Sequence, residues 1–556
     1  MNPPPSVADQ LRLTQQKPLV SRLLAVKPCP SGPPYTSSLQ ISRDDPFPVP
    51  GPHEVCIRTR AVGLNHIDWK NLEHEIMVKQ WPEVLGFEIA GVVELVGMDV
   101  EARLQVGQEV FGLSGPVGIM GGPPASHPFP AIRVGKGGPD DKGGDGKKSA
   151  GEGKAKKSLE EILIEEAEKA DSRLEEKGVW TGRAGGFQDV TCVHMSWVTR
   201  KPASWGFERA AGVPLVYITA CSAIVCGLGI QLPFLANNKP AFDDSLHLES
   251  LTIDTTSPIA THNDPRKTGA DELKDIPENK FGVKSVLVLG GSSGVGGSAI
   301  QLLRMALGPK AVIIATSNNE DSFPWLQKCG ATAHLRGEFE ALAEKVRLLT
   351  EGKGVDAILD CISGAACLDD SPPTPPSRWT DDDVETKKRC NEKENVPKDD
   401  KDKENSGPKT QQKKDKSAAG TDKITIKDDP ESEITIKDIP ELKTATEDEQ
   451  ESKAMSFWDV FREDGPKLYA EVATGRKVDV PTDRGIRATL VFSIMILSQP
   501  GGERALQELP ALIESGEFIF PHPGGVKVVG KGLESVAPVL AELREGSGGW
   551  KFVVEL

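Results

Sequence analysis

Hydrophobic and polar residues follow two different patterns along this chain. Between residues 55 and 112, short stretches in which apolar and polar residues alternate are separated by glycines. This pattern predicts the short strands of a small β-barrel-like domain. From residue 283 onward, apolar runs alternate with segments of helical periodicity, beginning with VKSVLVLG, SAIQLLRMALG and AVIIATS. Strands separated by helix-length segments predict an α/β fold, a doubly wound parallel sheet with helices on both faces.

Three segments interrupt these patterns, and we expect them to be long disordered insertions. They span residues 121–177, 236–280 and 369–449. The third is a charged low-complexity tract, which cannot bury enough apolar surface to offset the entropy lost on folding. It is also the candidate site for a protein partner. In the first segment, Glu and Lys recur at spacings of three and four between Leu159 and Glu176, which is typical of a solvated helix.

Length and charge narrow the function further. A chain of 556 residues exceeds what one hydrophobic core normally serves, so at least two domains are expected. A net charge of −16 argues against nucleic acid or an anionic membrane as a partner. The nine cysteines show no paired spacing, the N-terminus has no secretory pattern, and the apolar run near residues 486–497 is too short to span a bilayer. We therefore expect a cytoplasmic protein, either a monomer or a homodimer.

A glycine-rich loop lies directly between a predicted strand and a predicted helix. It reads Gly291-Ser292-Ser293-Gly294-Val295-Gly296, so Ser293 stands where a dinucleotide fingerprint has its middle glycine. Amides at a helix N-terminus can bind a pyrophosphate, and no GK[ST] follows that would indicate a P-loop. The loop therefore predicts dinucleotide binding; the alternative is a glycine-rich turn with a purely structural role.

The end of the next predicted strand indicates which dinucleotide is bound. It reads Ser317-Asn318-Asn319, with no carboxylate before Glu320. An NAD site usually has Asp or Glu at this place to bind the adenosine ribose, whereas small polar groups leave room for a 2′-phosphate. We therefore predict NADP(H), although Glu320 is close enough to favour NAD. Arg336, after the third strand, can meet the 2′-phosphate or be a solvated cation of a loop.

Several motifs resemble those of the medium-chain dehydrogenase/reductase superfamily in sequence and in order. They are EVCIRTRAVGLNHIDWKN, PEVLGFEIAGVVELVG, RLQVGQEVFGL, GGFQDVTCV, FERAAGVPLVYITACSAI and the glycine-rich loop. The resemblance implies a GroES-like catalytic domain over 1–212, a Rossmann NADP-binding domain over 213–480, and a return of the chain to the first domain over 481–556.

Departures from the zinc enzymes of this superfamily point to one branch. Asn65 stands where those enzymes have a cysteine ligand, and Phe87 stands where they have a histidine. His66 and Glu88 remain, but zinc needs about three protein ligands, so we predict no metal. The Asn65-x-x-Asp68-x-Lys70 pattern, DCISG and the C-terminal segment are similar to the zinc-free quinone oxidoreductase-like branch. Within that branch the likeness is closest to the trans-acting enoyl reductases of fungal polyketide pathways.

The resemblance also implies a set of site residues. Those bordering the cofactor are Asn65, Asp68, Lys70, Ser292, Ser293, Gly294, Val295, Ser317, Asn318, Asn319, Gly548 and Gly549. For catalysis we predict Lys70, which can stabilise an enolate or hold a ribose, and Thr219, which is expected to open the helix that connects the domains. The alternatives are an exposed lysine and an ordinary helix cap.

The reaction predicted from these features is reduction of the C=C bond of an enoyl thioester or another α,β-unsaturated carbonyl, or of a quinone. The substrate is then a small molecule or is bound to a carrier. Without a metal there is no Lewis acid to polarise a ketone, whereas an activated alkene delocalises the incoming charge as an enolate. A second class of function stays open, a cofactor-binding sensor or scaffold without turnover, which Ser293 in place of glycine favours.

Overall fold

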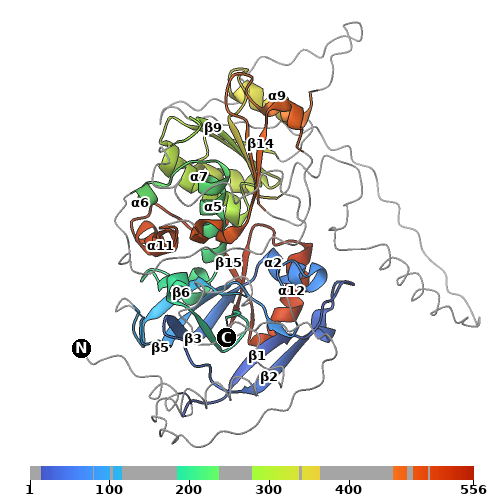
Figure 1. Ribbon diagram of the computed structural model, residues 1–556. Coiled ribbons are helices and arrows are strands. Elements are labelled where there is room, and N and C mark those ends of the chain that lie inside the picture. The colour runs from blue at the N-terminus through green and yellow to red at the C-terminus, as the bar shows by residue number, and fades with distance from the viewer. Residues whose placement is uncertain are drawn as a thin grey trace, which may run out of the picture.

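The computed structural model describes residues 14, 16–78, 81–100, 104–115, 184–236, 279–336, 341–362, 455–472, 480–498 and 501–556 (Figure 1). The predicted insertions 121–177 and 369–449, with the candidate helix in the first, lie outside these residues. The insertion 236–280 also lies outside them, except at its two ends. There the short helix α6 (Pro233–Ala236) ends, and Asn279 forms an isolated bridge with Ile230.

The first domain is built on two antiparallel sheets, with one parallel pair at the edge of the larger. The larger sheet has the order β15-β16-β3-β5-β6-β8, with β7 also paired to β3, and the smaller has the order β2-β1-β4. Their bounds are β1 (Val20–Ala25), β2 (Leu39–Asp45), β3 (Glu54–Gly63), β4 (Glu83–Val84), β5 (Glu88–Val96), β6 (Glu109–Leu113), β7 (Val190–His194), β8 (Val198–Arg200), β15 (Val526–Lys531) and β16 (Lys551–Glu555). This confirms the GroES-like part of the predicted fold class.

The second domain is a six-stranded parallel sheet of the predicted Rossmann type, with the order β11-β10-β9-β12-β13-β14. Its strands are β9 (Ser285–Leu289), β10 (Val312–Ser317), β11 (Ala333–Arg336), β12 (Ala357–Asp360), β13 (Leu468–Val472) and β14 (Arg487–Val491). The predicted boundary at residue 481 is too early, because β14 pairs in parallel with β13 and so belongs to this sheet.

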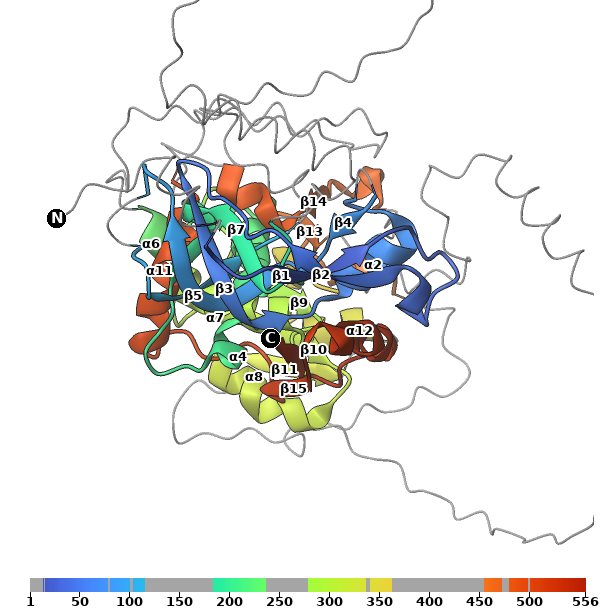
Figure 2. The same ribbon diagram turned by 90° about the horizontal axis from the view of Figure 1, so that it is seen from below.

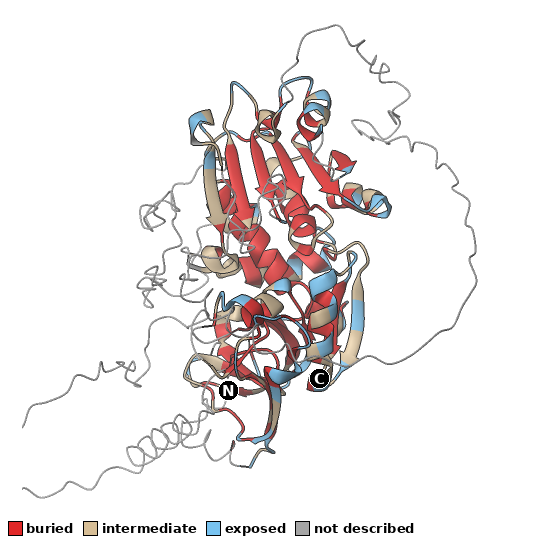
Figure 3. Cartoon of the chain, turned by 90° about the vertical axis from the view of Figure 1, so that its right-hand side faces the viewer, coloured by how far each residue is buried: buried red, intermediate tan, exposed pale blue. Residues whose placement is uncertain are grey.

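Helices cover both faces of the parallel sheet, as alternation of the strand residues requires. Val286 and Val288 face a cluster that includes α5, α7, α8 and α11, whereas Leu287 and Leu289 face α9 and η9. These helices are α5 (Pro214–Ser222), α7 (Gly294–Leu307), α8 (Phe323–Cys329), α9 (Leu342–Leu349), α11 (Arg504–Glu514) and the 3-10 turn η9 (Phe457–Val460). Figure 3 shows the strands of this sheet as the most continuously buried part of the chain.

The remaining described helices are short or lie in the first domain. They are α2 (His66–His74), α4 (Phe207–Ala210), α12 (Val536–Glu545), the π-helical turn η3 (Ala223–Gly227) and the 3-10 turns η1 (Tyr35–Ser37), η2 (Met195–Trp197), η6 (Glu320–Ser322), η10 (Thr482–Arg484), η11 (Ser493–Ser498) and η12 (Leu533–Ser535). The turn η9 is capped by Ser456.

Two crossings of the chain join the domains. From α4 the chain runs through α5 and η3 into the Rossmann domain, and from α11 it returns to the first domain. There β16 pairs with β3 through Val553 and Gly63. Helix α12 packs against α2, and both helices are labelled in the view from below in Figure 2. One described helical stretch, Phe207–Gly227, has the length and apolar character of a membrane span. However, 89% of its most apolar window is buried inside the protein, as in the core helix of a globular domain.

Candidate cofactor cleft

The glycine-rich loop forms the sharp turn between β9 and α7. Gly290 has a φ of +72°, and α7 begins at Gly294. A methyl group on Gly296 would overlap the carbonyl oxygen of Gly290, so only glycine fits there. Ser293 is the N-cap of α7, and its Oγ accepts a hydrogen bond from the Gly296 amide at 3.1 Å. The serine that replaces the middle glycine therefore leaves the loop and the helix terminus intact.

A cluster of hydroxyl groups joins this loop to the end of β10. Oγ of Ser317 lies 2.9 Å from Oγ of Ser292 and 2.8 Å from Oγ of Ser322, and it accepts the Asn319 amide at 3.1 Å. Ser317 is buried, whereas Asn318 and Asn319 are exposed. The structure thus brings the two predicted cofactor segments together, with the exposed asparagines as the groups that a ligand reaches first.

A cation lies beside this cluster. Arg336 on β11 is in register with Ser317 on β10. Its Nη1 lies 3.7 Å from Oε1 of Glu320, and both side chains are largely exposed. Exposed pairs of this kind contribute about 0–1 kcal/mol, so Glu320 holds Arg336 only weakly.

On the first-domain side, the Asn65–Lys70 segment forms the start of α2. Asn65 is the N-cap, and its amide donates to Oδ2 of Asp68 at 2.8 Å. Asp68 is fully buried, and burial raises its pKa to about 7 although the Asn65 amide and Lys551 act in the opposite direction. Lys70 is half-buried, with its Nζ 5.5 Å from the centre of the Trp69 ring.

A buried ion pair lies behind this segment. Nζ of Lys551 lies 2.6 Å from Oε2 of Glu88 and donates to Oδ1 of Asn65 at 2.7 Å. Nδ2 of Asn65 donates to the same Glu88 oxygen at 2.9 Å, and the other Glu88 oxygen accepts the amide of Leu215 at 2.6 Å. Both charged side chains are inaccessible to solvent or nearly so. Glu88 therefore binds the cation of β16 and the first turn of α5 at the same time.

Lys551 was not among the predicted site residues, although a signal for it was present. It is the lysine at the head of the apolar strand KFVVE, where a charged residue needs a partner to be buried. The partner could not be identified from the sequence, because Asn65 and Lys551 are 486 residues apart.

The residues at the expected metal position do not fit zinc. Phe87 is buried in the core, and both Asn65 and Glu88 direct their oxygens at the Lys551 ammonium. A divalent cation at this place would have to displace that ammonium. In the described parts of the chain, no group of three or more His, Cys, Asp or Glu side chains is arranged to hold a metal ion.

Thr219 differs from its predicted place. The expectation that it opens the connecting helix is wrong, because α5 begins at Pro214 after the N-cap Val213. Thr219 lies inside α5, is buried, and donates its hydroxyl proton to the carbonyl of Leu215 at 2.6 Å. That proton is therefore not available to a substrate carbonyl in this conformation, and the cap prediction is wrong as well.

Gly548 and Gly549 lie in the turn before β16. The carbonyl of Gly549 accepts the Gly524 amide at 3.1 Å, so this turn contacts the segment that leads into β15. Both glycines have positive φ values, +58° and +87°. Their contact with a cofactor stays a prediction.

Comparisons with known proteins agree with this architecture. Residues 51–120 match the family "Alcohol dehydrogenase GroES-like domain", and residues 294–372 match "Zinc-binding dehydrogenase". Among solved structures, a putative zinc-dependent alcohol dehydrogenase from Rhizobium etli CFN 42 is similar, with a TM-score of 0.50 and 14% identity over 97% of this chain and 99% of that one. An alcohol dehydrogenase superfamily protein from Novosphingobium aromaticivorans gives 0.50 and 15%, with the same coverage.

Curated relatives are similar over shorter stretches. Dehydrogenase orsE of Emericella nidulans is 38% identical over 69 residues, which are 12% of this chain and 20% of that protein. A quinone oxidoreductase of Pseudomonas aeruginosa is 45% identical over 69 residues (12% and 21%), and the trans-enoyl reductase resD of Aspergillus sclerotiorum is 40% identical over 70 (12% and 18%). The matched segments span about a fifth of each relative.

The two family matches fall in the two domains that the fold defines. In both domains the chain is therefore similar to oxidoreductases of the alcohol dehydrogenase type.

Proposed function

We propose that this protein is a zinc-independent, NADPH-dependent reductase of activated C=C bonds, in α,β-unsaturated carbonyls or enoyl thioesters, or of quinones. The observation that carries this proposal is the Lys551 ammonium bound to Asn65 and Glu88, at the position where zinc enzymes of the superfamily have ligands. The names of the relatives, a quinone oxidoreductase and a trans-enoyl reductase, support the same reaction class.

The residues of the cleft suit this chemistry. A bound nicotinamide cofactor would supply a hydride to the β-carbon of the substrate, and the charge then spreads onto the carbonyl oxygen. The protein has to align the reactants and exclude water, which needs no Lewis acid. Lys70 lies in the second turn of α2 and can place a positive charge near that oxygen. Lys551 is too deeply buried to take this role and instead fixes Asn65, which begins the same helix.

The choice of NADPH over NADH rests on the end of β10. Asn318 and Asn319 are exposed polar groups, and the neighbouring Arg336 guanidinium is weakly held by Glu320. A 2′-phosphate bound there would replace Glu320 as the partner of Arg336, in a charge-assisted bond of the kind that favours arginine. A carboxylate introduced at this strand end would repel the 2′-phosphate. Because Ser317 is buried, the exposed Asn318 is a better position for that carboxylate than Ser317.

The cofactor assignment is tested by titrating the protein with NADPH and with NADH. Arg336→Gln is expected to weaken NADPH binding by about tenfold, the equivalent of one charge-assisted hydrogen bond, and to leave NADH binding unchanged. Asn318→Asp should lower the preference for NADPH in the same direction. Lys310→Gln is the matched control, because Lys310 is an exposed cation before β10, at the opposite end of that strand. Equal affinity of the wild-type protein for both dinucleotides would contradict the assignment.

The reaction is tested by NADPH consumption with a panel of enoyl thioesters, enones and quinones, before and after treatment with a chelator. Turnover of at least one acceptor that the chelator leaves unchanged is the expected result. If the protein contains stoichiometric zinc and the chelator removes both the zinc and the activity, zinc independence is overturned. Tight NADPH binding without consumption of any acceptor would favour the sensor or scaffold instead.

A further inference from the structure

One imidazole nitrogen is enclosed at the N-terminus of α7 without a partner. His522 belongs to the segment that leads from α11 to β15, and its ring lies against Gly294, the first residue of α7. A methyl group on Gly294 would overlap Nε2 and Cε1 of His522. Nε2 is shielded from solvent and has no hydrogen-bond partner among the residues that the structure describes. The 14-residue helix α7 therefore points its positive end at a nitrogen that nothing in the described structure uses.

Burial and one nearby cation decide the protonation of this ring. Burial, and then the positive charge of Lys551, lower the pKa of His522 well below its usual value. His66 is at the first position of α2, and its Nδ1 accepts the Trp69 indole N–H at 3.1 Å. His522 is therefore neutral in the free protein at neutral pH. An anion bound beside the ring would raise its pKa.

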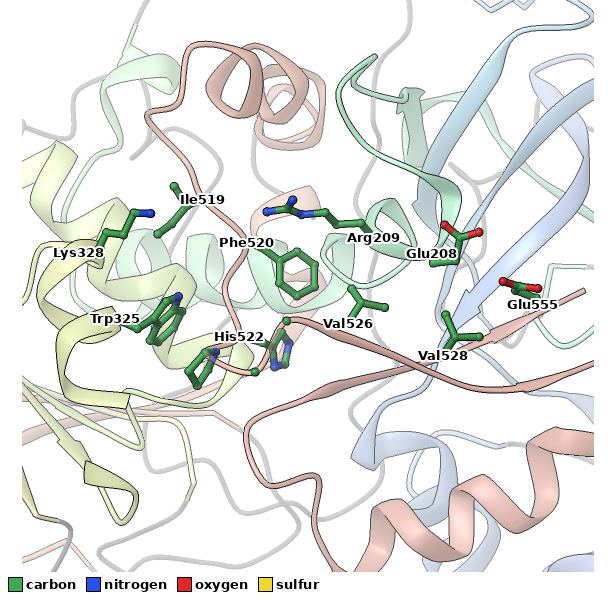
Figure 4. A pocket seen from close by; sticks show the side chains of 13 residues that line it. Glu208, Arg209, Trp325, Lys328, Ile519, Phe520, His522, Val526, Val528 and Glu555 are labelled. Atoms are coloured by element: carbon green, nitrogen blue, oxygen red, sulfur yellow. The ribbon is translucent and has the colours of Figure 1, made fainter. Parts of the chain in front are cut away.

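The other side of the ring faces a groove of about 640 Å³ between the two domains (Figure 4). His522 lies in the wall of this groove between Trp325 and Val526. The charged side chains that line the groove are Glu208, Arg209, Lys328 and Glu555. Arg209 lies over the rings of Trp205 and Phe520, at 4.7 and 5.3 Å from their centres.

We propose that His522 binds the pyrophosphate of the dinucleotide together with the N-terminus of α7, and that it takes up one proton in doing so. This inference rests on the proposed function for the place of the pyrophosphate. Two negative phosphate charges beside the ring stabilise the imidazolium and offset the repulsion from Lys551. Burial lowers the pKa of His66 to about 4, so His66 is neutral at neutral pH. The proton comes from solvent and stays on the ring while the cofactor is bound, so no bond other than N–H is made.

The sign of the resulting pH dependence follows from linkage. The pKa of His522 is low in the free protein and higher in the complex, so between these two values binding takes up a proton. Within that window the dissociation constant rises by up to about tenfold per pH unit as the pH rises. Above the pKa of the complex the ring is neutral in both states, and affinity no longer changes with pH.

The experiment compares wild-type protein with His522→Gln, whose amide has similar reach but takes up no proton. NADH and NADPH are titrated by fluorescence from pH 5.5 to 8.5. NADH is essential as a probe, because the 2′-phosphate of NADPH itself titrates near pH 6. Calorimetry in two buffers of different ionisation enthalpy measures the protons taken up. Wild type should take up close to one proton inside the window, and His522→Gln none.

His53→Gln is the matched control. His53 precedes β3, whose far end at Gly63 borders the cleft, so a ten-residue strand separates it from the site. It should retain the wild-type pH dependence. If His522→Gln does not fold, as judged by thermal melting, the ring is followed directly by NMR in wild-type protein labelled with ¹⁵N-histidine. Protonation of that ring on addition of NADH is then expected.

Three results would overturn the inference. They are the same pH slope in wild type and in His522→Gln, no proton uptake by wild type at any pH, and a His522 ring that stays neutral when NADH binds. Failure of wild-type protein to bind either dinucleotide is a different outcome, because it contradicts the proposed function first.

Discussion

The predicted cofactor site has two sides: the glycine-rich loop with the end of β10, and the Asn65–Lys70 segment with Lys551. The two sides hold their polar groups by different means. On the Rossmann side, backbone amides, glycines and a cluster of serine hydroxyls are supplied by the ends of two adjacent strands. On the first-domain side, a charged lysine, a glutamate and an asparagine from three distant segments meet in a dry interior. Amides and hydroxyls carry no net charge, so the first arrangement is insensitive to pH. The second is stable only while its charges match, since a buried charge without a partner costs several kcal/mol.

The largest expected effect comes from removing the cation of the charged side. Lys551→Ala leaves Glu88 buried without its partner, and we expect it to lower the free energy of unfolding by about 3–5 kcal/mol. Lys353→Ala removes one partner of an exposed pair with Glu351 and should cost less than about 1 kcal/mol. Chemical denaturation measures both. A loss for Lys551→Ala no greater than that of the control would mean that the ion pair does not support the first domain.

The next effect breaks the Rossmann side. A methyl group on Gly296 meets the backbone of Gly290, which cannot move aside, whereas the atoms nearest to one on Gly294 belong to the side chains of His522 and Val216. Gly296→Ala should weaken dinucleotide binding by at least about tenfold, or 1.4 kcal/mol, and more than Gly294→Ala. Fluorescence titration with NADPH is the measurement, and equal losses would contradict the structure of the loop.

A further effect concerns pH and separates the two sides. The pKa of Asp68 is about 7 in the folded protein and near 3.9 when unfolded, so the native state retains a proton that the unfolded chain releases. Its contribution to stability is present below about pH 4 and is lost as the pH rises to 7, by up to about 1.4 kcal/mol per pH unit. Asp68→Asn should remove this slope.

Denaturant unfolding at several pH values measures the free energy of unfolding of wild type and of Asp68→Asn. Wild type should lose stability relative to the variant from pH 4 to 7, and the difference should then stay constant. Part of the slope should remain in the variant, because burial also raises the pKa of Glu83 to about 7. Ser317→Ala, on the Rossmann side, is the control and should shift stability equally at every pH. A constant difference for Asp68→Asn would show that its carboxyl is ionised throughout.

The smallest effect tests the helix between the two sides. The Thr219 hydroxyl donates to the carbonyl of Leu215 inside α5, so Thr219→Val removes one local hydrogen bond. We expect a change in stability of about 1 kcal/mol or less and little change in turnover. Steady-state kinetics decide this, since a loss of turnover with unchanged stability would restore the catalytic role that the sequence predicted.

What the sequence could predict depends on how local the interactions are. The loop Gly291–Gly296 and the segment Ser317–Asn319 each lie at a strand end, so their meeting follows from the parallel sheet alone. The domain boundary was placed too early because β14 was not recognised as a sixth parallel strand, and such a strand reveals itself only by its partner β13. The place of Thr219 was predicted wrongly although Pro214 marks a common first position of a helix.

The charged side of the cleft was beyond sequence reasoning. Asn65, Asp68 and Glu88 were each singled out, but the pattern of a single chain does not show that Lys551 lies between two of them. The orientation of His522 toward α7 depends on the path of an irregular segment between two domains, for which no periodicity exists. Ser293 shows the opposite case, because a serine before a helix is a familiar cap and could have been predicted to replace the glycine.

The pairing of β16 with β3 has a consequence for how this protein is made. During synthesis the ribosome produces Asn65 and Glu88 early, and the whole Rossmann domain follows before Lys551 emerges. At about 5–20 residues per second, the 486 residues between Asn65 and Lys551 take roughly 25 to 100 s to translate. For that time β3 lacks its partner strand beside Ala61–Gly63, and the Glu88 carboxylate lacks the Lys551 cation. The barrel is therefore completed only after the Rossmann domain has been synthesised.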